Sequence, residues 1–428
     1  MNVCAIKLTN ICRKVSHIVL FVFCTILSKA QQAEEITFTH AGKTVYGTFT
    51  KPSASGVFPT IIINSGSGAN DRNGTLVMVG ANVECLYPGL LNDTLRPYKW
   101  LSDALVDSGF AVLRFDKIEY TYSTPTTLGA ITFEKLWLPV ESAIDYAKTR
   151  SDVDTTNIIL IGHSEGSSLI PFIARERNDV QALISLAGPR TPLDSILAYQ
   201  FIEIATHCGG NVPQTQAQVD QILAYFTSIR NNTWNASTPA VFGIPASAWN
   251  DYIEVVDSVS INYNLANLPS LFLGLGLDFN VPPAELTRFQ NEVTCTDDFW
   301  SIPGLIHYMT PNNLPVFSEA LSDTIVYWLR QPGVLAGINQ ATKQSSEIRC
   351  FPNPFSESVS ISYPPLKPNS TVKISVVTPL GKEVFHTELQ QHDVQSNTTL
   401  NLDFLPKGLY WVIVNADGVN VVSKVIKE

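Results

Sequence analysis

The chain has 428 residues, of which 45% are hydrophobic and 15% are charged, and its formal net charge is −10. This length exceeds what one domain usually needs, and the apolar content is ample for a large core, so two or three modules are expected. An acidic chain of this kind is a poor candidate for binding nucleic acid or anionic membrane surfaces.

The first 30 residues have the pattern of a secretory signal peptide. Basic residues precede an apolar run at residues 18–27, and residues 28–30 offer small side chains for cleavage. The run is too short for a permanent membrane anchor. We therefore predict removal of residues 1–30, which changes the formal net charge from −10 to −14 and leaves no integral membrane segment in the mature chain. A lipoprotein anchor on Cys24 is the alternative, although Phe23 is bulky for such a site.

Four cysteines remain after this cleavage, and they are scattered along the chain: Cys85, Cys208, Cys295 and Cys350. They lack Cys-x-x-Cys spacing, so a zinc site is not expected. Disulfides suit an exported protein, but the sequence alone does not pair these residues.

Strand and helix patterns alternate before residue 160. Strands are predicted at residues 36–39, 44–50, 59–64 and 110–116, and helices at residues 99–109 and 136–149. The first two strands flank a glycine turn, as in a β-hairpin. The third is almost wholly apolar and β-branched, which is typical of a strand buried on both faces. The alternation indicates a mostly parallel sheet with helices on both faces.

A glycine-rich loop at residues 65–74 follows the third strand. A phosphate-binding loop is one interpretation, but the lysine and the glycine spacing of such loops are missing. The preferred interpretation is an oxyanion loop, in which the Ser67 amide approaches a substrate oxygen. Asp71 and Arg72 could contact substrate, although an ion pair that braces the loop is the preferred role for both.

The strongest motif is Gly-x-Ser-x-Gly at residues 162–166, with Ser164 at its centre, directly after an apolar run at residues 157–161. A sharp turn from strand to helix needs glycine neighbours, and it displays the serine hydroxyl at the edge of the sheet. The predicted helix at residues 165–175 points its first N–H groups at the same place. A plain Gly-Ser turn is the alternative. The flanking strand and helix favour a nucleophile, with the Glu165 amide as a second oxyanion donor.

Five motifs occur together in the order found in one family: residues 66–74, 112–117, 162–166, 276–283 and 303–307. Residues 35–330 thereby resemble the α/β-hydrolases of the dienelactone-hydrolase and serine-aminopeptidase type. The resemblance implies an α/β-hydrolase domain at residues 31–330 and serine hydrolase chemistry. Relatives tend to continue the Asp-Lys pair of the second motif with Arg-Gly, whereas this chain continues with Ile118-Glu119-Tyr120, a departure that concerns the local loop.

A serine nucleophile needs a histidine to take its proton. Of the seven histidines, three lie in the signal peptide or the tail, and His163 is tied to the strand end beside the serine. His40 precedes the glycine-rich loop and His207 lies in a segment that resembles a cap. His307 remains, after a plausible last strand at residues 298–302, and it is the predicted base.

The histidine in turn needs an acid to orient it. Asp278 follows a predicted strand at residues 271–277, and the chain order serine, aspartate, histidine is the order that this fold uses. An aspartate at such a junction is often only a turn residue. Asp297 and Asp298 are the alternatives.

These residues predict acyl transfer in two steps. Ser164 attacks an ester, thioester or amide carbonyl while His307 accepts its proton, Asp278 orients His307, and the Ser67 and Glu165 amides stabilise the oxyanion. Water then releases the acyl group. The substrate is expected to be a small-molecule or peptidic acyl compound, and no metal or organic cofactor is implied. An esterase or acyl hydrolase is preferred over a serine peptidase of the aminopeptidase type, and an inert binding protein on a hydrolase fold is the alternative from another class.

An insertion at about residues 189–268 is interpreted as a cap over the site. Thr215 and Gln218 fit a capping box that opens a helix running to Arg230. Four aromatic residues of this segment could line a substrate pocket or simply pack within the cap: Tyr225, Trp234, Trp249 and Tyr252.

Residues 331–348 have the composition of a linker and follow a predicted helix at residues 317–330. Short strands that mostly alternate at period two are predicted beyond it, at residues 358–363, 371–377, 382–386, 399–402, 409–414 and 421–426. An Asp-Gly turn at residues 417–418 joins the last two. A small all-β sandwich over residues 349–428 is therefore expected.

The same region carries short motifs at residues 351–355, 379–381 and 405–410, followed by a lysine-bearing terminus. It resembles the type A sorting domain of the type IX secretion pathway. The resemblance implies the type IX secretion machinery as a partner, and export through the periplasm to the medium or the cell surface. A generic adhesion or carbohydrate-binding sandwich is the alternative.

Overall fold

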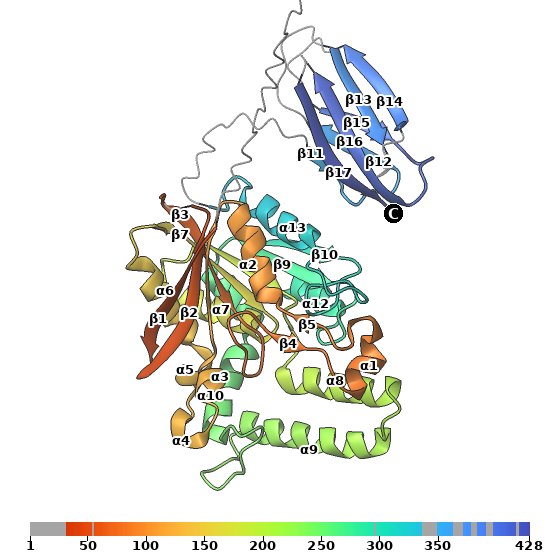
Figure 1. Cartoon of the computed structure of the whole chain (residues 1–428). Coiled ribbons are helices and arrows are strands. Elements are labelled where there is room, and N and C mark those ends of the chain that lie inside the picture. The colour runs from red at the N-terminus through yellow and green to blue at the C-terminus, as the bar shows by residue number, and fades with distance from the viewer. Residues whose placement is uncertain are drawn as a thin grey trace, which may run out of the picture. The chain divides into compact units, whose positions relative to one another are not determined.

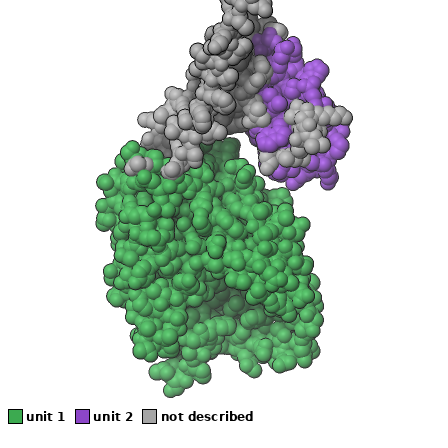
Figure 2. Space-filling model, viewed as in Figure 1, with its two compact units in different colours: residues 1–336 green, residues 337–428 purple. Residues whose placement is uncertain are grey.

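A computed structural model describes residues 31–53, 55–294, 297–335, 349–362, 371–377, 383–390, 397–416 and 419–428. The chain divides into two compact units, one up to Ala336 and one from Gly337 (Figure 1, Figure 2). The predicted signal peptide and most of the predicted linker lie outside the described residues.

The first unit is built on an eight-stranded sheet in the order β1-β2-β6-β3-β7-β8-β9-β10. Its strands are β1 (Gln32–His40), β2 (Lys43–Lys51), β3 (Phe58–Asn64), β6 (Ala111–Phe115), β7 (Val153–His163), β8 (Ala182–Leu186), β9 (Ser270–Leu275) and β10 (Asp297–Ile302). β1 and β2 form the predicted hairpin, and β2 joins β6 in antiparallel fashion. All pairs from β6 onward are parallel, so the predicted mostly parallel sheet is confirmed.

Successive residues of the central strands enter two different apolar cores, which explains why β3 and β7 are apolar on both faces. Ile62 and Leu160 belong to the core on one face of the sheet, whereas Ile61 and Ile159 belong to the core on the other. All four side chains are completely buried. Burying one such side chain stabilises the fold by about 1.5–3 kcal/mol. Continuous apolar runs therefore predicted these strands correctly.

Helices cover both faces of the sheet (Figure 1). α2 (Pro97–Asp107) and α13 (Glu319–Leu329) share one core, and α6 (Pro139–Lys148), α7 (Glu165–Arg175) and α12 (Ala284–Glu292) share the other. The helix predicted at residues 136–149 is wrong in one respect, because α5 ends at Trp137 and Pro139 begins α6. Short elements fill the connections: β4 (Leu76–Val77), α1 (Ala81–Leu86), a 3-10 turn (Pro88–Leu90), β5 (Thr94–Leu95), α3 (Ile118–Thr121), α4 (Pro125–Leu128) and α5 (Phe133–Trp137).

The insertion between β8 and β9 is helical. It contains α8 (Leu193–His207), α9 (Val212–Arg230), α10 (Ala246–Val256) and α11 (Val259–Ala266). The predicted capping box of Thr215 and Gln218 is wrong, because α9 begins at Val212. Its cap is Asn211, whose side chain accepts a hydrogen bond from the Gln214 amide at 3.1 Å. We call α8–α11 the cap.

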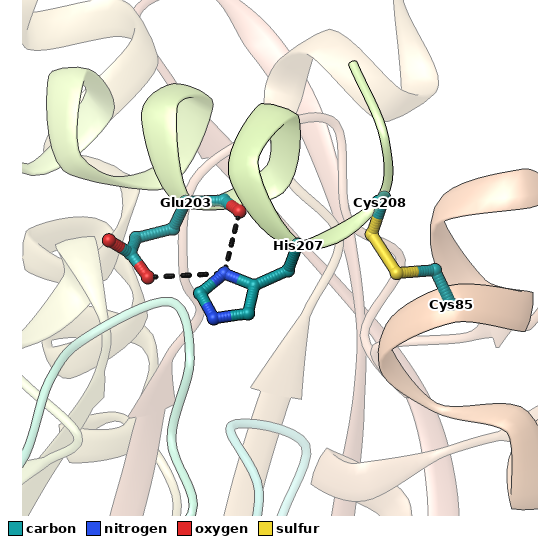
Figure 3. Close-up of a disulfide and its surroundings, with 4 residues drawn as sticks. All are labelled: Cys85, Glu203, His207 and Cys208. Atoms are coloured by element: carbon teal, nitrogen blue, oxygen red, sulfur yellow. Dashed lines mark hydrogen bonds and ion pairs between the residues drawn. A yellow bond between two sulfur atoms is a disulfide. The ribbon is translucent and has the colours of Figure 1, made fainter. Parts of the chain in front are cut away.

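A disulfide joins the cap to the sheet-bearing part of the first unit. It links Cys85 in α1 to Cys208 directly after α8, across 123 residues of sequence (Figure 3). Of the other cysteines retained after the predicted cleavage, Cys350 is a free thiol and Cys295 lies outside the described residues.

The second unit is an antiparallel β-sandwich. One sheet contains β11 (Arg349–Phe351), β12 (Ser358–Ser362) and β15 (Asn397–Asn401), and the other contains β13 (Thr371–Val377), β14 (Glu383–Gln390), β16 (Gly408–Ala416) and β17 (Val419–Lys427). Side chains from both sheets share one core, for example Val359 of the first and Val412 of the second. The predicted turn at residues 417–418 lies outside the described residues, but β16 and β17 pair as expected.

Candidate active site

Ser164 lies at the junction between β7 and α7, in a strained positive-φ backbone conformation with φ 53° and ψ −125°. The neighbouring glycines permit this turn. A Cβ on Gly162 would lie 2.5 Å from the backbone of α7, and one on Gly166 would lie 2.3 Å from the carbonyl oxygen of Asn64. The Ser164 amide donates to the Leu186 carbonyl at 2.9 Å, which fixes the turn against β8. Backbone strain of this kind costs about 1–3 kcal/mol and concentrates at functional sites.

Ser164 borders a small cavity beneath the cap. Ser67 of the glycine-rich loop and Glu165 line the same cavity, so three of the predicted site residues meet there. The cap contributes mainly apolar lining, from Leu193, Ile196 and Leu197 of α8 and from Tyr252 and Val256 of α10. Glu165 is the one charged side chain in this lining, as far as the described residues show.

Asp278 and His307 follow β9 and β10, at the sheet edge where β7 also ends. Both are buried, and Nδ1 of His307 lies 2.8 Å from Oδ2 of Asp278. The other carboxylate oxygen accepts the amides of Asn280 at 2.8 Å and Val281 at 2.9 Å. Because a carboxylate only accepts hydrogen bonds, Nδ1 of His307 is the donor. A neutral His307 therefore keeps Nε2 unprotonated and able to take a proton.

His163 connects the loop of His307 to the turn of Ser164. Burial lowers the pKa of His163 well below its ordinary value, and the neighbouring His307 lowers it further, so the ring is neutral. Nε2 of His163 donates to the His307 carbonyl at 3.0 Å, and Nδ1 accepts from the Tyr98 hydroxyl at 2.9 Å. Tyr98 in turn accepts the Gly66 amide at 2.9 Å. One chain of hydrogen bonds thus joins three loops of the site.

The carboxylate of Glu165 is buried and fully paired. Its Oε2 lies 3.0 Å from Nζ of Lys117, and its Oε1 accepts from Nε1 of Trp137 at 3.2 Å and from the Tyr252 hydroxyl at 3.1 Å. Burial lowers the pKa of Lys117, but attraction to Glu165 and Glu119 outweighs it, so the pKa is raised and Lys117 is a cation. None of these contacts of the Glu165 carboxylate was predicted from the sequence. A lysine directly after a buried strand was the available signal, but it served there only as part of a family motif.

The other histidines and acids named from the sequence lie elsewhere. His40 lies 2.9 Å from the Ser142 hydroxyl, and Nδ1 of His207 lies 2.9 Å from the Glu203 carbonyl within α8 (Figure 3). Asp298 accepts from Nε1 of Trp328 at the start of β10, at the opposite end of the strand from His307. The Asp297 side chain lies outside the described residues. Asp278 is therefore the acid that contacts His307.

Asp71 and Arg72 both brace the glycine-rich loop, but not through a shared ion pair. Nη2 of Arg72 lies 2.8 Å from Oδ2 of Asp116, and the same guanidinium contacts Glu35. Asp71 accepts the Thr75 amide at 2.7 Å. The prediction of an ion pair is thus correct for Arg72 and wrong for Asp71, which closes the loop by capping its backbone.

The described residues contain no group of three or more His, Cys, Asp or Glu side chains placed to hold a metal ion. They also contain no helix with the length and apolar character needed to cross a membrane.

Two family models match parts of the chain. Residues 349–428 match the secretion system C-terminal sorting domain, which confirms the resemblance stated for the tail. Residues 140–256 match the model described as BAAT / acyl-CoA thioester hydrolase C terminal. The second match includes β7, the Ser164 turn, α7 and three of the cap helices, α8–α10.

Individual proteins are also similar. Esterase EstD of Thermotoga maritima is 31% identical over 284 residues, which is 66% of this chain and 60% of the esterase. The chain therefore spans about 60% of the length of that relative. Among solved structures, the esterase domain of a Rhodothermus marinus protein is 15% identical, with 70% of this chain and 98% of that chain covered and a TM-score of 0.42. Dienelactone hydrolase from Anabaena variabilis is 14% identical, with coverage of 70% and 97% and a TM-score of 0.41.

The strand order, the helices on both faces and the two family matches agree with one another. The chain therefore combines an α/β-hydrolase fold with a secretion system C-terminal sorting domain.

Proposed function

We propose that the protein is an exported serine hydrolase that cleaves ester or thioester bonds through an acyl-enzyme. One observation carries the proposal: the buried hydrogen bond between His307 and Asp278, 2.8 Å long, at the sheet edge where Ser164 is displayed. This bond fixes the histidine tautomer that leaves Nε2 free for a proton.

In the proposed reaction, Oγ of Ser164 attacks the acyl carbonyl and its proton passes to Nε2 of His307. Asp278 stabilises the imidazolium that forms. The carbonyl oxygen becomes an oxyanion and accepts hydrogen bonds from the Ser67 and Glu165 amides, and losing one such donor typically costs about 2.7–4 kcal/mol of transition-state stabilisation. His307 then protonates the leaving alcohol or thiol. Water repeats the sequence and releases the acid.

The cavity beside Ser164 favours a neutral acyl substrate over a peptide with a free amino terminus. An aminopeptidase needs a free anion to hold the substrate ammonium group. Glu165 is the one charged side chain lining this cavity within the described residues, and Lys117 already neutralises it. The similarity to an esterase supports the same choice.

The sorting domain supports export of the protein. The disulfide between Cys85 and Cys208 is compatible with a compartment outside the cytosol. We propose that the predicted signal peptide directs the chain into the periplasm and that the type IX machinery recognises residues 349–428. Deletion of residues 349–428 should then leave active enzyme in the periplasm, whereas unchanged export would contradict this route.

Labelling with a fluorophosphonate tests the serine chemistry. The wild type should label and should hydrolyse short acyl esters, and Ser164→Ala should do neither. Ser168→Ala is a matched control, because Ser168 lines the same cavity one turn further along α7, and it should label like the wild type. Equal labelling of the wild type and Ser164→Ala would show that the proposed nucleophile is wrong.

A further inference from the structure

Lys117 is a buried cation whose partner is the residue next to the proposed nucleophile. Its side chain is 7% exposed and that of Glu165 is 8% exposed, with 3.0 Å between Nζ and Oε2. A buried ion pair rarely adds net stability over apolar residues of the same size, because both ions lose their hydration. Stability alone is therefore a weak reason for a lysine and a glutamate at this place.

The position of Glu165 gives the pair an electrostatic consequence. The backbone amide of Glu165 is a proposed oxyanion donor, so its carboxylate lies on the residue that must stabilise a developing negative charge. An uncompensated anion there would repel the oxyanion, and at a few ångströms in a protein interior such a repulsion slows a reaction by about tenfold or more. Lys117 removes this repulsion.

We propose that Lys117 is a positioning residue of the reaction: it cancels the charge of Glu165 and holds that side chain so that the Glu165 amide can serve the oxyanion. The inference rests on the proposed serine hydrolase function. Tyr252 and Trp137 also fix the Glu165 side chain, because both donate to the same carboxylate oxygen. The centroids of their rings lie 4.5 Å apart. Tyr252 belongs to the cap, so the cap takes part in this arrangement.

Other titratable groups around the Glu165 carboxylate do not supply the missing charge. Burial raises the pKa of Tyr252 on α10 and of Tyr98 on α2, so both hydroxyls are neutral. Glu119 on α3 lies 3.8 Å from Nζ of Lys117, and burial raises its pKa. Among these described groups, Lys117 alone is a cation. Its removal therefore leaves Glu165 without compensation.

The test compares Lys117→Met with Glu165→Gln by the pH profile of kcat on a short acyl ester. An unpaired buried carboxyl keeps its proton to a higher pH than a paired one. In Lys117→Met, Glu165 should therefore be neutral at low pH and anionic at high pH, and kcat should fall by at least about tenfold between pH 6 and pH 9. Glu165→Gln retains acceptors for Trp137 and Tyr252 and should lack this alkaline fall, as should the double variant.

Lys148→Met is the matched control, because Lys148 pairs with Asp179 at the end of α6, outside the site, and should keep the wild-type profile. Equal and pH-independent losses in Lys117→Met and Glu165→Gln would overturn the proposal, as would an alkaline fall in the double variant. If Lys117→Met does not fold, the double variant decides: a loss of kcat under about tenfold with a flat alkaline side supports the proposal, and a larger loss overturns it. Wild-type activity that does not depend on Ser164 would instead contradict the proposed function.

Discussion

The edge of the sheet and the cap are built differently, although both border the same cavity. Ser164, Asp278 and His307 come from short loops at strand ends, where hydrogen bonds to backbone groups hold each loop. The two longest cap helices, α8 and α9, bury few side chains: α9, with 19 residues, buries only Val219, Phe226 and Ile229. A disulfide and the ion pairs of Arg230 with Asp194 and Asp257 supplement that packing. We therefore expect the edge to supply the reacting groups, and the cap to supply most of the cavity wall together with the Tyr252 hydroxyl that holds Glu165.

An aspartate-to-asparagine substitution at the sheet edge and the same substitution in the cap should give the largest difference in activity between the two regions. Asp278→Asn keeps the shape of the site but favours the wrong tautomer of His307, so kcat should fall by about 10⁴-fold. Asp194→Asn is the counterpart in the cap, where Asp194 is buried and accepts from Arg230 at 2.8 Å. It should alter stability and KM with a much smaller change in kcat. Steady-state kinetics on one short ester measures both, and equal losses of kcat would remove the distinction.

The disulfide offers the next largest effect. Cys208→Ser opens a link across 123 residues and should lower the free energy of unfolding by about 2–4 kcal/mol. The folded variant should still label at Ser164, because the edge of the sheet does not depend on this bond. Chemical denaturation followed by fluorescence measures the change. Cys350→Ser in the second unit is the control and should leave the first unit unaffected. A loss of labelling in folded Cys208→Ser would show that the edge and the cap are one cooperative site.

His163 should make the stability of the first unit depend on pH. Its pKa is lowered in the folded state, so below its ordinary value of about 6.5 the unfolded chain takes up a proton that the folded chain rejects. The free energy of unfolding should thus fall as the pH drops below about 6.5, by up to about 1.4 kcal/mol per pH unit. His163→Gln should flatten this slope, and His207→Gln, which changes an exposed side chain of the cap, should leave it unchanged. A wild-type stability that is constant between pH 7 and pH 5 would contradict the account.

The smallest effect is expected far from the site. Hydrogen bonds from Arg150 and Lys51 lower the pKa of Asp152 to about 2. A carboxyl with a lowered folded-state pKa stabilises the fold at higher pH, and that contribution is lost as the pH falls through its folded value. The wild type should therefore lose stability between about pH 4 and pH 2, and Asp152→Asn should lose less over that range. Asp103→Asn, in an exposed pair with Lys99, is the control, and acid unfolding curves measure the difference.

The sequence predicted the parts of the fold that depend on neighbours along the chain. The apolar run that contains Ile61 and Ile62 predicted a strand buried on both faces. The structure agrees, because successive side chains of this strand enter different cores. The glycines on either side of Ser164 predicted the sharp turn, because a side chain at either glycine position would collide with neighbouring backbone atoms. The chain order then led to Asp278 and His307, which the structure brings into contact.

Contacts between residues that are far apart in the sequence, and that meet only through the order of the strands or through the cap, were not predicted. Lys117 and Glu165 are 48 residues apart, and no spacing rule relates them; they meet because β6 and β7 flank β3 and all three end at one edge. Tyr252 is 87 residues from Glu165 and arrives through the cap. The disulfide between Cys85 and Cys208 could not be predicted from the spacing of the cysteines either. The predicted start of α9 at Thr215 was wrong because a better capping residue, Asn211, lies four positions earlier and begins the helix.

The hydrogen bond from Tyr252 of the cap to Glu165 limits which other insertions could replace the cap on this fold. The Tyr252 hydroxyl is one of the donors that hold the carboxylate beside Ser164. A chimera that exchanged the inserted helices to alter substrate preference would also delete that donor from the proposed reaction centre. The transplanted segment would have to bring a hydroxyl of its own to the same point, and recombination libraries should be screened for that single group before any search for new specificity.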